Sequence, residues 1–302
     1  MKPEKNHQFL AVILGGANGI GAACCEVMHA RGWRVAVADK DLAAAEATAR
    51  VVGGTAFEVD VTHPESFNQL AKTIERSMGP IEALVVSSGT FQESEPIDQT
   101  ADDTFDRIIS VNLRGTYQAN RILAAGMVRR GHGCIVNLSS VTGHASTPLN
   151  IYGPSKAAII NMTQSLAGEW GSAGVRVNSV SPGITLVPRI VERRRAGVRY
   201  GKGVDDQMAL RRLVEPNEVA EAVEFLCLSR ASAITGVDLV VLWLADGGAV
   251  EYLRWASRAA VFGGMISDES STELPITLRV ERLIAMLQIR SVAYAMIAAS
   301  LY

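Results

Sequence analysis

The fold is decided by the stretch Phe9-Leu10-Ala11-Val12-Ile13-Leu14-Gly15-Gly16-Ala17-Asn18-Gly19-Ile20-Gly21. Residues 9–14 are continuously apolar, which indicates a parallel strand that is buried on both faces. The glycines after it lead into a helical pattern over Ala22–Ala30. A turn between a buried strand and a helix N-terminus presents backbone N–H groups and a positive dipole end to an anion. The same glycines could also serve only to form a tight turn with positive φ angles.

Strands and helices alternate along the next part of the chain. The predicted strands cover Trp33–Ala38, Thr55–Val59, Ile81–Val86, Cys134–Leu138 and Val175–Val180. The predicted helices cover Ala43–Val51, His63–Met78, Thr100–Arg130 and Tyr152–Trp170. This alternation predicts an α/β fold with a doubly wound parallel sheet of the Rossmann type. Ligands bind such sheets beyond the carboxyl ends of the strands, so Gly15, Asp39, Asp60 and Gly89 are expected to line one cleft.

The composition fits a globular protein. The chain has 302 residues, of which 48% are hydrophobic and 20% charged, and its formal net charge of -2 favours neither nucleic acid nor an anionic membrane. No apolar run is long enough for a transmembrane helix, and the short run after the basic N-terminus is a better match to a first strand than to a signal peptide. The four cysteines show no metal-ligand or disulfide spacing. We therefore expect no metal site and a reducing, cytoplasmic environment.

Tyr152 and Lys156 stand four residues apart at the start of a helical pattern, so they lie on one helix face. A lysine ammonium near a phenol favours the phenolate and lowers the pKa of the tyrosine from its free value of about 10. A tyrosine tuned in this way can donate or accept a proton near neutral pH. Taken alone, the same spacing also fits an ordinary amphipathic helix.

Asp39 follows the second predicted strand, about twenty residues past the glycine-rich turn. In a dinucleotide-binding fold an acid at this place hydrogen-bonds the adenosine ribose hydroxyls. Its carboxylate would repel the extra phosphate of NADP, which favours NAD. Asp39 could instead cap the helix that begins near Leu42, a role that Asp41 could also fill.

The order of these motifs resembles the short-chain dehydrogenase/reductase family over roughly residues 8–250. The matching motifs are Gly15-x-x-x-Gly19-Ile20-Gly21, Asp39, Asp60-Val61, Asn112, Ser140, Tyr152-x-x-x-Lys156, Pro182-Gly183, Arg212-Leu213-x-Glu215-Pro216-x-Glu218-Val219-Ala220 and Ile234-Thr235-Gly236. The resemblance implies a single domain over residues 1–250 that holds both the cofactor and the substrate sites. It further implies NAD as cofactor, a small-molecule alcohol or carbonyl substrate, and a homo-oligomer, either a dimer or a tetramer, with no nucleic-acid or membrane partner.

The resemblance also assigns roles. Tyr152 would exchange the proton on the substrate oxygen, Lys156 would lower the pKa of Tyr152 and bind the nicotinamide ribose, Ser140 would hold the substrate oxygen, and Asn112 would support a proton-carrying water chain. The expected cofactor-binding residues are Gly15, Asn18, Gly19, Ile20, Gly21, Asp39, Asp60, Val61, Ser88, Gly89, Tyr152, Lys156, Pro182, Gly183 and Thr185. An alternative function is non-catalytic NAD binding or regulation on the same fold, because fold alone does not establish catalysis.

Three features depart from the family pattern. Leu14 replaces a threonine, and Val86-Ser87-Ser88-Gly89 replaces Asn-Asn-Ala-Gly, so we expect Leu14 and Val86 to pack together where the family has a polar contact. The interval from Ser140 to Tyr152 is one residue shorter than usual, and counting back from Tyr152 would select Ser139 in place of Ser140. The substrate-lid segment at 190–212 is rich in arginine, which suits an acidic substrate or a solvated charged surface.

Residues 251–302 have no counterpart in the family. They are expected to form an atypical C-terminal extension that is partly helical, with an amphipathic helix from Ile276 to about Ser300.

Overall fold

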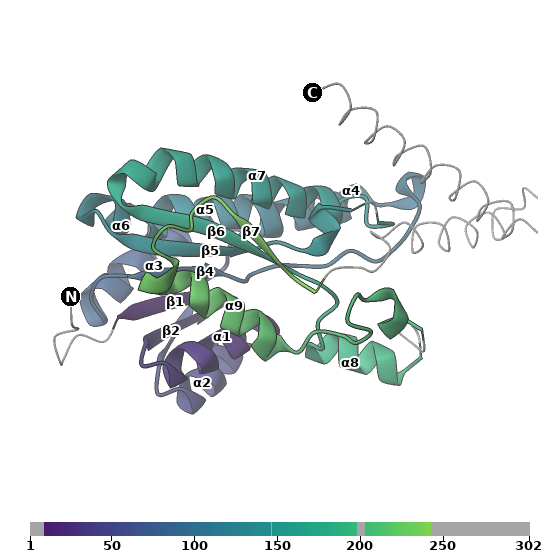
Figure 1. Ribbon diagram of the computed structural model, residues 1–302, viewed down its shortest axis with the longest axis horizontal. Helices are drawn as coiled ribbons and strands as arrows, with labels where there is room; N and C mark the ends of the chain where they lie inside the picture. The colour runs from purple at the N-terminus through teal and green to yellow at the C-terminus, as the bar shows by residue number, and fades with distance from the viewer. Residues whose placement is uncertain (1–8, 146, 198–202, 243–302) are drawn as a thin grey trace, which may run out of the picture. The chain divides into compact units, whose positions relative to one another are not determined.

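The computed structural model of the protein describes residues 9–145, 147–197 and 203–242. The central sheet in this part of the chain has seven parallel strands in the order β3-β2-β1-β4-β5-β6-β7 (Figure 1). The strands are β1 (Leu10–Leu14), β2 (Arg34–Asp39), β3 (Thr55–Glu58), β4 (Ala83–Val86), β5 (Gly133–Leu138), β6 (Val175–Pro182) and β7 (Asp238–Val241). The predicted doubly wound parallel sheet is confirmed. Its strand order changes direction between β1 and β4, where ligands bind in such folds.

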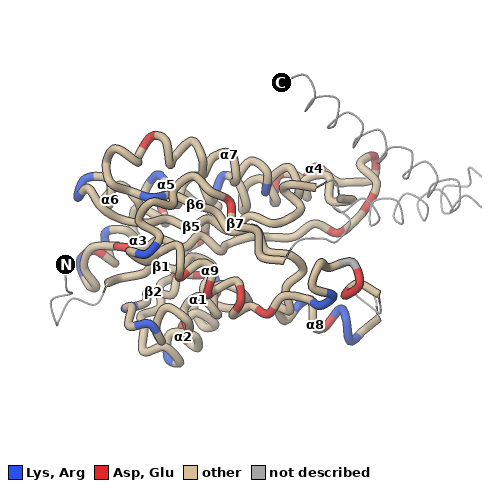
Figure 2. Tube along the Cα trace, viewed as in Figure 1, with Lys and Arg blue, Asp and Glu red and all other residues tan. Residues whose placement is uncertain are grey.

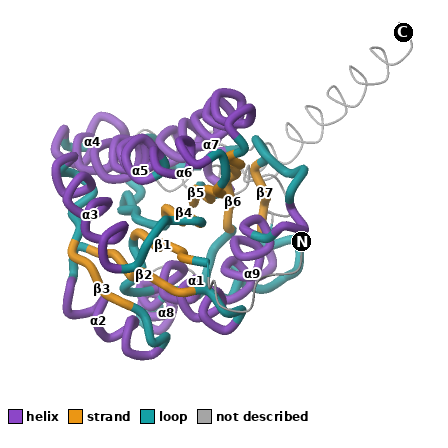
Figure 3. The backbone as a smooth tube through the Cα atoms, turned by 90° about the vertical axis from the view of Figure 1, so that its left-hand side faces the viewer, coloured by secondary structure: helices purple, strands orange, loops and turns teal. Residues whose placement is uncertain are grey.

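Helices cover both faces of the sheet. They are α1 (Gly19–Ala30), α2 (Leu42–Val51), α3 (Pro64–Ser77), α4 (Asp102–Ile108), α5 (Gly115–Leu123), α6 (Ala125–Arg130), α7 (Tyr152–Trp170), α8 (Pro188–Arg195) and α9 (Pro216–Cys227). Figures 1 and 3 show α1, α2 and α9 on one side and α3 to α7 on the other. Ala11 and Ile13 of β1 pack toward the first layer, and Leu10, Val12 and Leu14 toward the second. Burial on both faces explains why this strand is apolar without alternation.

The helix predicted over Thr100–Arg130 is interrupted in the structure. After α4, residues Ile109–Arg114 form a π-helical turn, and α5 and α6 follow as separate helices. The side chain of Asn112 in this turn bonds the backbone of Thr90 in another segment. Such a π-bulge is common at functional sites, and an apolar periodicity along the chain does not reveal it.

Helices α8 and α9 and strand β7 were not predicted. Helix α9 begins at a capping box, in which Glu215 and Glu218 bond each other's backbone N–H groups, with Pro216 in the first turn. Strand β7 has only four half-buried residues and pairs with the end of β6. Short edge strands such as this one carry a weak sequence signal.

Leu14 and Val86 are directly opposite each other where β1 pairs with β4. Both side chains are buried and belong to the same apolar cluster, as expected from the sequence. No helix within the described residues is both long and apolar enough to cross a membrane. The boundary of the predicted domain at residue 250 and the predicted extension over 251–302 lie outside the described residues.

Candidate active site

The glycine-rich turn lies at the carboxyl end of β1 and leads into α1. A Cβ atom on Gly15, whose φ is +75°, would lie 2.7 Å from the backbone nitrogen of Ser88. A Cβ atom on Gly21 would lie 1.9 Å from the carbonyl oxygen of Gly15. Both positions therefore require glycine. Asn18, the N-cap of α1, is exposed and makes no capping bond, and the first turn of α1 has no acidic residue. This helix end is chemically suited to an anion such as a pyrophosphate.

Asp39 ends β2 beside this turn. Its Oδ2 accepts a hydrogen bond from the Ala17 backbone N–H at 3.1 Å, and its Oδ1 accepts one from Asp41 N–H at 3.2 Å. The cap of α2 is Asp41, whose side chain accepts from Ala44 N–H at 3.0 Å. Asp39 therefore does not cap α2, and its half-buried carboxylate is fixed next to the glycine-rich turn.

Asp60 and Val61 follow β3 at the same edge. Oδ1 of Asp60 accepts hydrogen bonds from the backbone N–H and the hydroxyl of Thr62, and these bonds lower the pKa of the Asp60 carboxyl below its usual value. Val61 packs against the start of α5, where a Cβ on Gly115 would lie 3.0 Å from the Val61 Cβ. Asp60 is therefore ionised and held in one orientation.

Tyr152 and Lys156 lie on the first turns of α7. Lys156 Nζ is 5.6 Å from the centroid of the Tyr152 ring and donates a hydrogen bond to the Leu138 carbonyl oxygen at 2.8 Å. The Lys156 side chain is buried, and this burial lowers its pKa to about 8. A cationic group near the phenol is thus present, as the spacing predicts.

Asn112 is fully buried, and its amide connects three segments. Its Oδ1 accepts from Thr90 N–H at 2.7 Å, and its Nδ2 donates to the Thr90 carbonyl at 3.0 Å and to Ser155 Oγ at 3.2 Å. Gly89 lies beside it, since a Cβ there would be 3.6 Å from Asn112 Oδ1 and 3.7 Å from Lys156 Nζ. Asn112, Gly89 and Lys156 are therefore neighbours in space.

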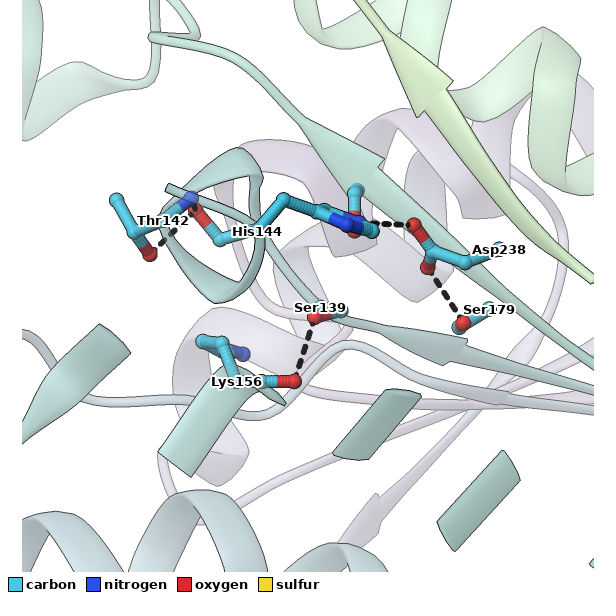
Figure 4. Close-up of polar contacts among 8 residues, drawn as sticks. Ser139, Thr142, His144, Lys156, Ser179 and Asp238 are labelled. Atoms are coloured by element: carbon cyan, nitrogen blue, oxygen red, sulfur yellow. Dashed lines mark hydrogen bonds and ion pairs between the residues drawn. The ribbon is translucent and has the colours of Figure 1, made fainter. Parts of the chain in front are cut away.

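Ser139 and Ser140 make different use of their hydroxyl groups. Ser139 Oγ donates to the backbone oxygen of Lys156 at 2.8 Å, a contact drawn in Figure 4. Ser140 Oγ accepts from Thr142 N–H at 3.2 Å. The Ser139 proton is therefore committed to a carbonyl, whereas Ser140 can direct its own proton to a ligand.

A second polar cluster follows Ser140. The Asp238 carboxylate is nearly buried, pairs with His144 Nε2 at 2.7 Å, and accepts a hydrogen bond from Ser179 Oγ at 2.5 Å (Figure 4). Ser181 Oγ lies 3.4 Å from the same His144 nitrogen. A nucleophile–base–acid relay needs the serine and the carboxylate on different ring nitrogens. This cluster therefore ties the segment after Ser140 to β6 and β7, a role that its scattered sequence positions did not reveal.

A pocket of about 170 Å³ opens at this edge. Among the residues predicted for the site, its lining includes Ile20, Ser140, Tyr152, Pro182, Gly183 and Thr185. The sequence did not single out Phe91 and Arg189, which also line it. The Phe91 ring lies 5.0 Å from the Tyr152 ring, and the Arg189 guanidinium lies 4.1 Å over Phe91.

Two arginines of α8 form ion pairs with carboxylates of the same chain. Figure 2 shows basic and acidic residues intermixed there. Arg193 pairs with Glu93, and Arg194 pairs with Asp205, whose pKa the Arg194 guanidinium holds below its usual value. Two of the arginines that suggested an acidic substrate, Arg193 and Arg194, are thus engaged by the protein's own carboxylates.

Comparison with known proteins agrees with this architecture. A family model described as enoyl-(acyl carrier protein) reductase matches residues 15–249. Galactitol 2-dehydrogenase (L-tagatose-forming) of Cereibacter sphaeroides is 33% identical over 251 residues, covering 81% of this chain and 95% of the relative.

Two solved structures from Brucella melitensis are also similar. One is described as ribose-5-phosphate isomerase, with 40% identity, a TM-score of 0.76, and coverage of 83% of this chain and 96% of that one. The other is 3-ketoacyl-(acyl-carrier-protein) reductase complexed with NADH, with 27% identity, a TM-score of 0.73, and coverage of 80% and 98%. From the family model and the curated relative together, the chain belongs to the short-chain dehydrogenase/reductase family of oxidoreductases.

Proposed function

We propose that the protein transfers a hydride between NAD(H) and a secondary alcohol or ketone, with Tyr152 as general acid and base. The observation that carries this proposal is the convergence of Tyr152, Ser140 and Lys156 at the edge of the sheet that also holds the glycine-rich turn. A bound nicotinamide would supply the hydride acceptor or donor. The remaining requirements are proton transfer, orientation of the substrate and binding of the cofactor, and this chain has residues suited to each.

The residues at the sheet edge fit a dinucleotide. Gly15 and Gly21 allow the backbone of the turn to pack closely on Ser88 and on the start of α1, and the N-terminus of α1 favours a pyrophosphate. The Asp39 carboxylate, which is held beside the glycine-rich turn, would accept hydrogen bonds from the ribose hydroxyls and repel a 2′-phosphate. Gly89, Pro182, Gly183 and Thr185 would complete the site on the nicotinamide side. These features support NAD over NADP.

The proton would pass through Tyr152. When an alcohol is oxidised, the phenolate removes the hydroxyl proton as the hydride leaves the carbon, and the reverse holds for reduction of a ketone. The Lys156 ammonium favours the phenolate. The Ser140 hydroxyl would hold the substrate oxygen in place, and we assign this role to Ser140 because the Ser139 proton is used by the Lys156 carbonyl.

A panel of secondary alcohols, polyols, ketones and β-hydroxyacyl thioesters tests the proposal, with NADH absorbance as the readout. We expect turnover of at least one alcohol–ketone pair and a preference for NAD(H). NAD binding in a calorimeter without turnover across the panel would favour the non-catalytic alternative. Ribose 5-phosphate belongs in the panel because conversion to its ketose without a net change in NADH would indicate isomerisation in place of oxidation.

A further inference from the structure

Gln92 is a fully buried polar residue in the loop after β4, outside every motif of the sequence. Its Oε1 accepts hydrogen bonds from the backbone N–H groups of Ile151 at 2.9 Å and Tyr152 at 3.0 Å. Its Nε2 donates to Asn150 Oδ1 at 2.7 Å. The orientation of the amide is determined by these contacts, since only the oxygen can accept from two backbone N–H groups.

These contacts lie where α7 begins. The first N–H groups of a helix have no partner within the helix and normally bond a side chain at the N-cap. The N-cap of α7 is Ile151, which makes no side-chain cap bond. Gln92 supplies the missing acceptor from a segment about sixty residues earlier in the chain. The start of the helix that carries Tyr152 is therefore fixed by a tertiary contact.

The neighbours of Gln92 reinforce this contact. The Phe91 ring packs on the Tyr152 ring at 5.0 Å, and both backbone groups of Thr90 bond the side chain of Asn112. The segment Thr90–Gln92 thus contacts the backbone of Tyr152, its ring, and the buried Asn112. A shift of this segment would move the phenol relative to Lys156 and Ser140.

We propose that Gln92 is a positioning residue for Tyr152, holding the first turn of α7 so that the phenol stays in reach of Lys156 and Ser140. The inference rests on the proposed role of Tyr152 as general acid and base. It adds a residue to the machinery that neither the motifs nor the lining of the pocket contains.

The test compares three variants with the wild-type protein. Gln92→Leu keeps the side-chain volume and removes all three hydrogen bonds. Gln92→Glu keeps the two acceptor contacts, and the Asn150 amide can turn to donate to the new carboxylate. Thr163→Val is the matched control, because it removes the buried bond from Asn137 Nδ2 to Thr163 Oγ1 farther along the same helix.

Three quantities are measured for each variant: kcat on the best substrate of the panel, the Kd for NADH, and the pH at which Tyr152 ionises. Ionisation is followed by ultraviolet difference absorbance against Tyr152→Phe in the same background. We expect Gln92→Leu to lower kcat by about ten- to a hundredfold, the range for a small misplacement of a catalytic group. We also expect the ionisation of Tyr152 to move to higher pH, with the NADH Kd little changed. Gln92→Glu should restore most of kcat, and Thr163→Val should leave kcat and the ionisation pH unchanged.

The inference is overturned if Gln92→Leu leaves both kcat and the ionisation pH at their wild-type values, or if Thr163→Val changes them equally. If Gln92→Leu does not fold, Gln92→Asn, which shortens the side chain by one methylene, is judged by the same criteria. A wild-type protein that turns over nothing in the panel, but whose Tyr152 ionisation moves in Gln92→Leu, would refute the proposed function and support the positioning role.

Discussion

Lys156 brings a cationic group into the interior of the protein. Its side chain is 4% exposed and has the Leu138 carbonyl as a hydrogen-bond acceptor. Burial lowers its pKa from 10.5 to about 8. A lysine whose pKa is lower in the folded than in the unfolded protein destabilises the fold at every pH at which it is still charged in the folded state. Lys156 is therefore kept at the expense of stability, as expected for a functional residue.

This cost predicts that Lys156→Met stabilises the fold. Between pH 8 and 10.5 the unfolded chain binds more protons at this lysine than the folded chain, so the wild-type free energy of unfolding rises with pH there. The free energy of unfolding of Lys156→Met should exceed that of the wild-type protein by about 2 kcal/mol near pH 7, after allowing for the lost hydrogen bond. This difference should disappear toward pH 10.5. Urea unfolding at several pH values measures it, with the exposed Lys72→Met as control. A Lys156→Met protein that is less stable than wild type near pH 7 would contradict the argument.

Asp39 carries the prediction of cofactor preference. We expect the wild-type protein to bind NADH more tightly than NADPH. Asp39→Asn should lower the ratio of the Kd for NADPH to the Kd for NADH by about tenfold or more, which is a loss of about 1.4 kcal/mol in the preference for NADH. The reason is repulsion between the carboxylate and the 2′-phosphate. Asp41→Asn is the matched control, since it makes the same change of charge at the residue that caps α2. Equal effects of the two substitutions, measured by calorimetry, would show that Asp39 does not contact the ribose.

Most of the candidate site could be predicted at the residue scale, because its members belong to local motifs of fixed spacing. Gln92, Phe91 and Asp238 could not be predicted. Gln92 acts on a helix about sixty residues away, and Asp238 meets His144 across 94 positions of sequence. Their contacts form only in the folded chain, so no local sequence pattern identifies these residues.

At the scale of elements, β1 and β4 meet through an apolar pair. Leu14 and Val86 are opposite each other and buried, and the backbone N–H of Ser87 bonds the carbonyl of Leu14 at 2.9 Å. The backbone connection between the two strands is therefore kept without a polar side-chain contact. This geometry supports the hypothesis that the cofactor still binds despite the departure from the family pattern.

The apolar pair predicts that Leu14→Thr destabilises the protein. Burying an unpaired hydroxyl in place of an aliphatic side chain should lower the free energy of unfolding by about 2–4 kcal/mol. Adding Val86→Asn should recover part of this loss, because the amide can bond the hydroxyl between neighbouring strands. Urea unfolding of the two single variants and the double variant measures the coupling. If the losses in the free energy of unfolding are strictly additive, the two positions do not interact. A large loss of NADH affinity in Leu14→Thr would show that Leu14 affects the cofactor site.

The elements themselves were predicted unevenly, for physical reasons. The buried strands and the amphipathic helices have strong periodic patterns, and their predicted bounds agree with the structure to within a few residues. The helix over Thr100–Arg130 was predicted as one piece, because apolar periodicity does not mark the π-helical turn at Ile109–Arg114, where the Asn112 side chain bonds the backbone of Thr90. Strand β7 forms by pairing with the edge of β6, a tertiary contact that a local sequence pattern does not show.

For the whole molecule, the alternation of elements predicted the parallel sheet but not the order of its strands. That order places β1 next to β4 and brings the glycine-rich turn, Asp39 and the Tyr152 helix to one edge. The site is thus assembled from segments between residue 15 and residue 190. The expected homo-oligomer remains a prediction, which analytical ultracentrifugation of the full chain would test.

The central claim is that the Tyr152 phenol transfers the proton while hydride moves to or from the nicotinamide. Its most direct test is the kcat of Tyr152→Phe on the best alcohol–ketone pair, with NADH affinity measured in parallel. The substitution removes one hydroxyl and keeps the ring that packs on Phe91. We predict a loss in kcat of about 10²–10⁴-fold, with a much smaller effect on NADH affinity. Turnover by Tyr152→Phe at a rate close to that of the wild-type protein would contradict the account.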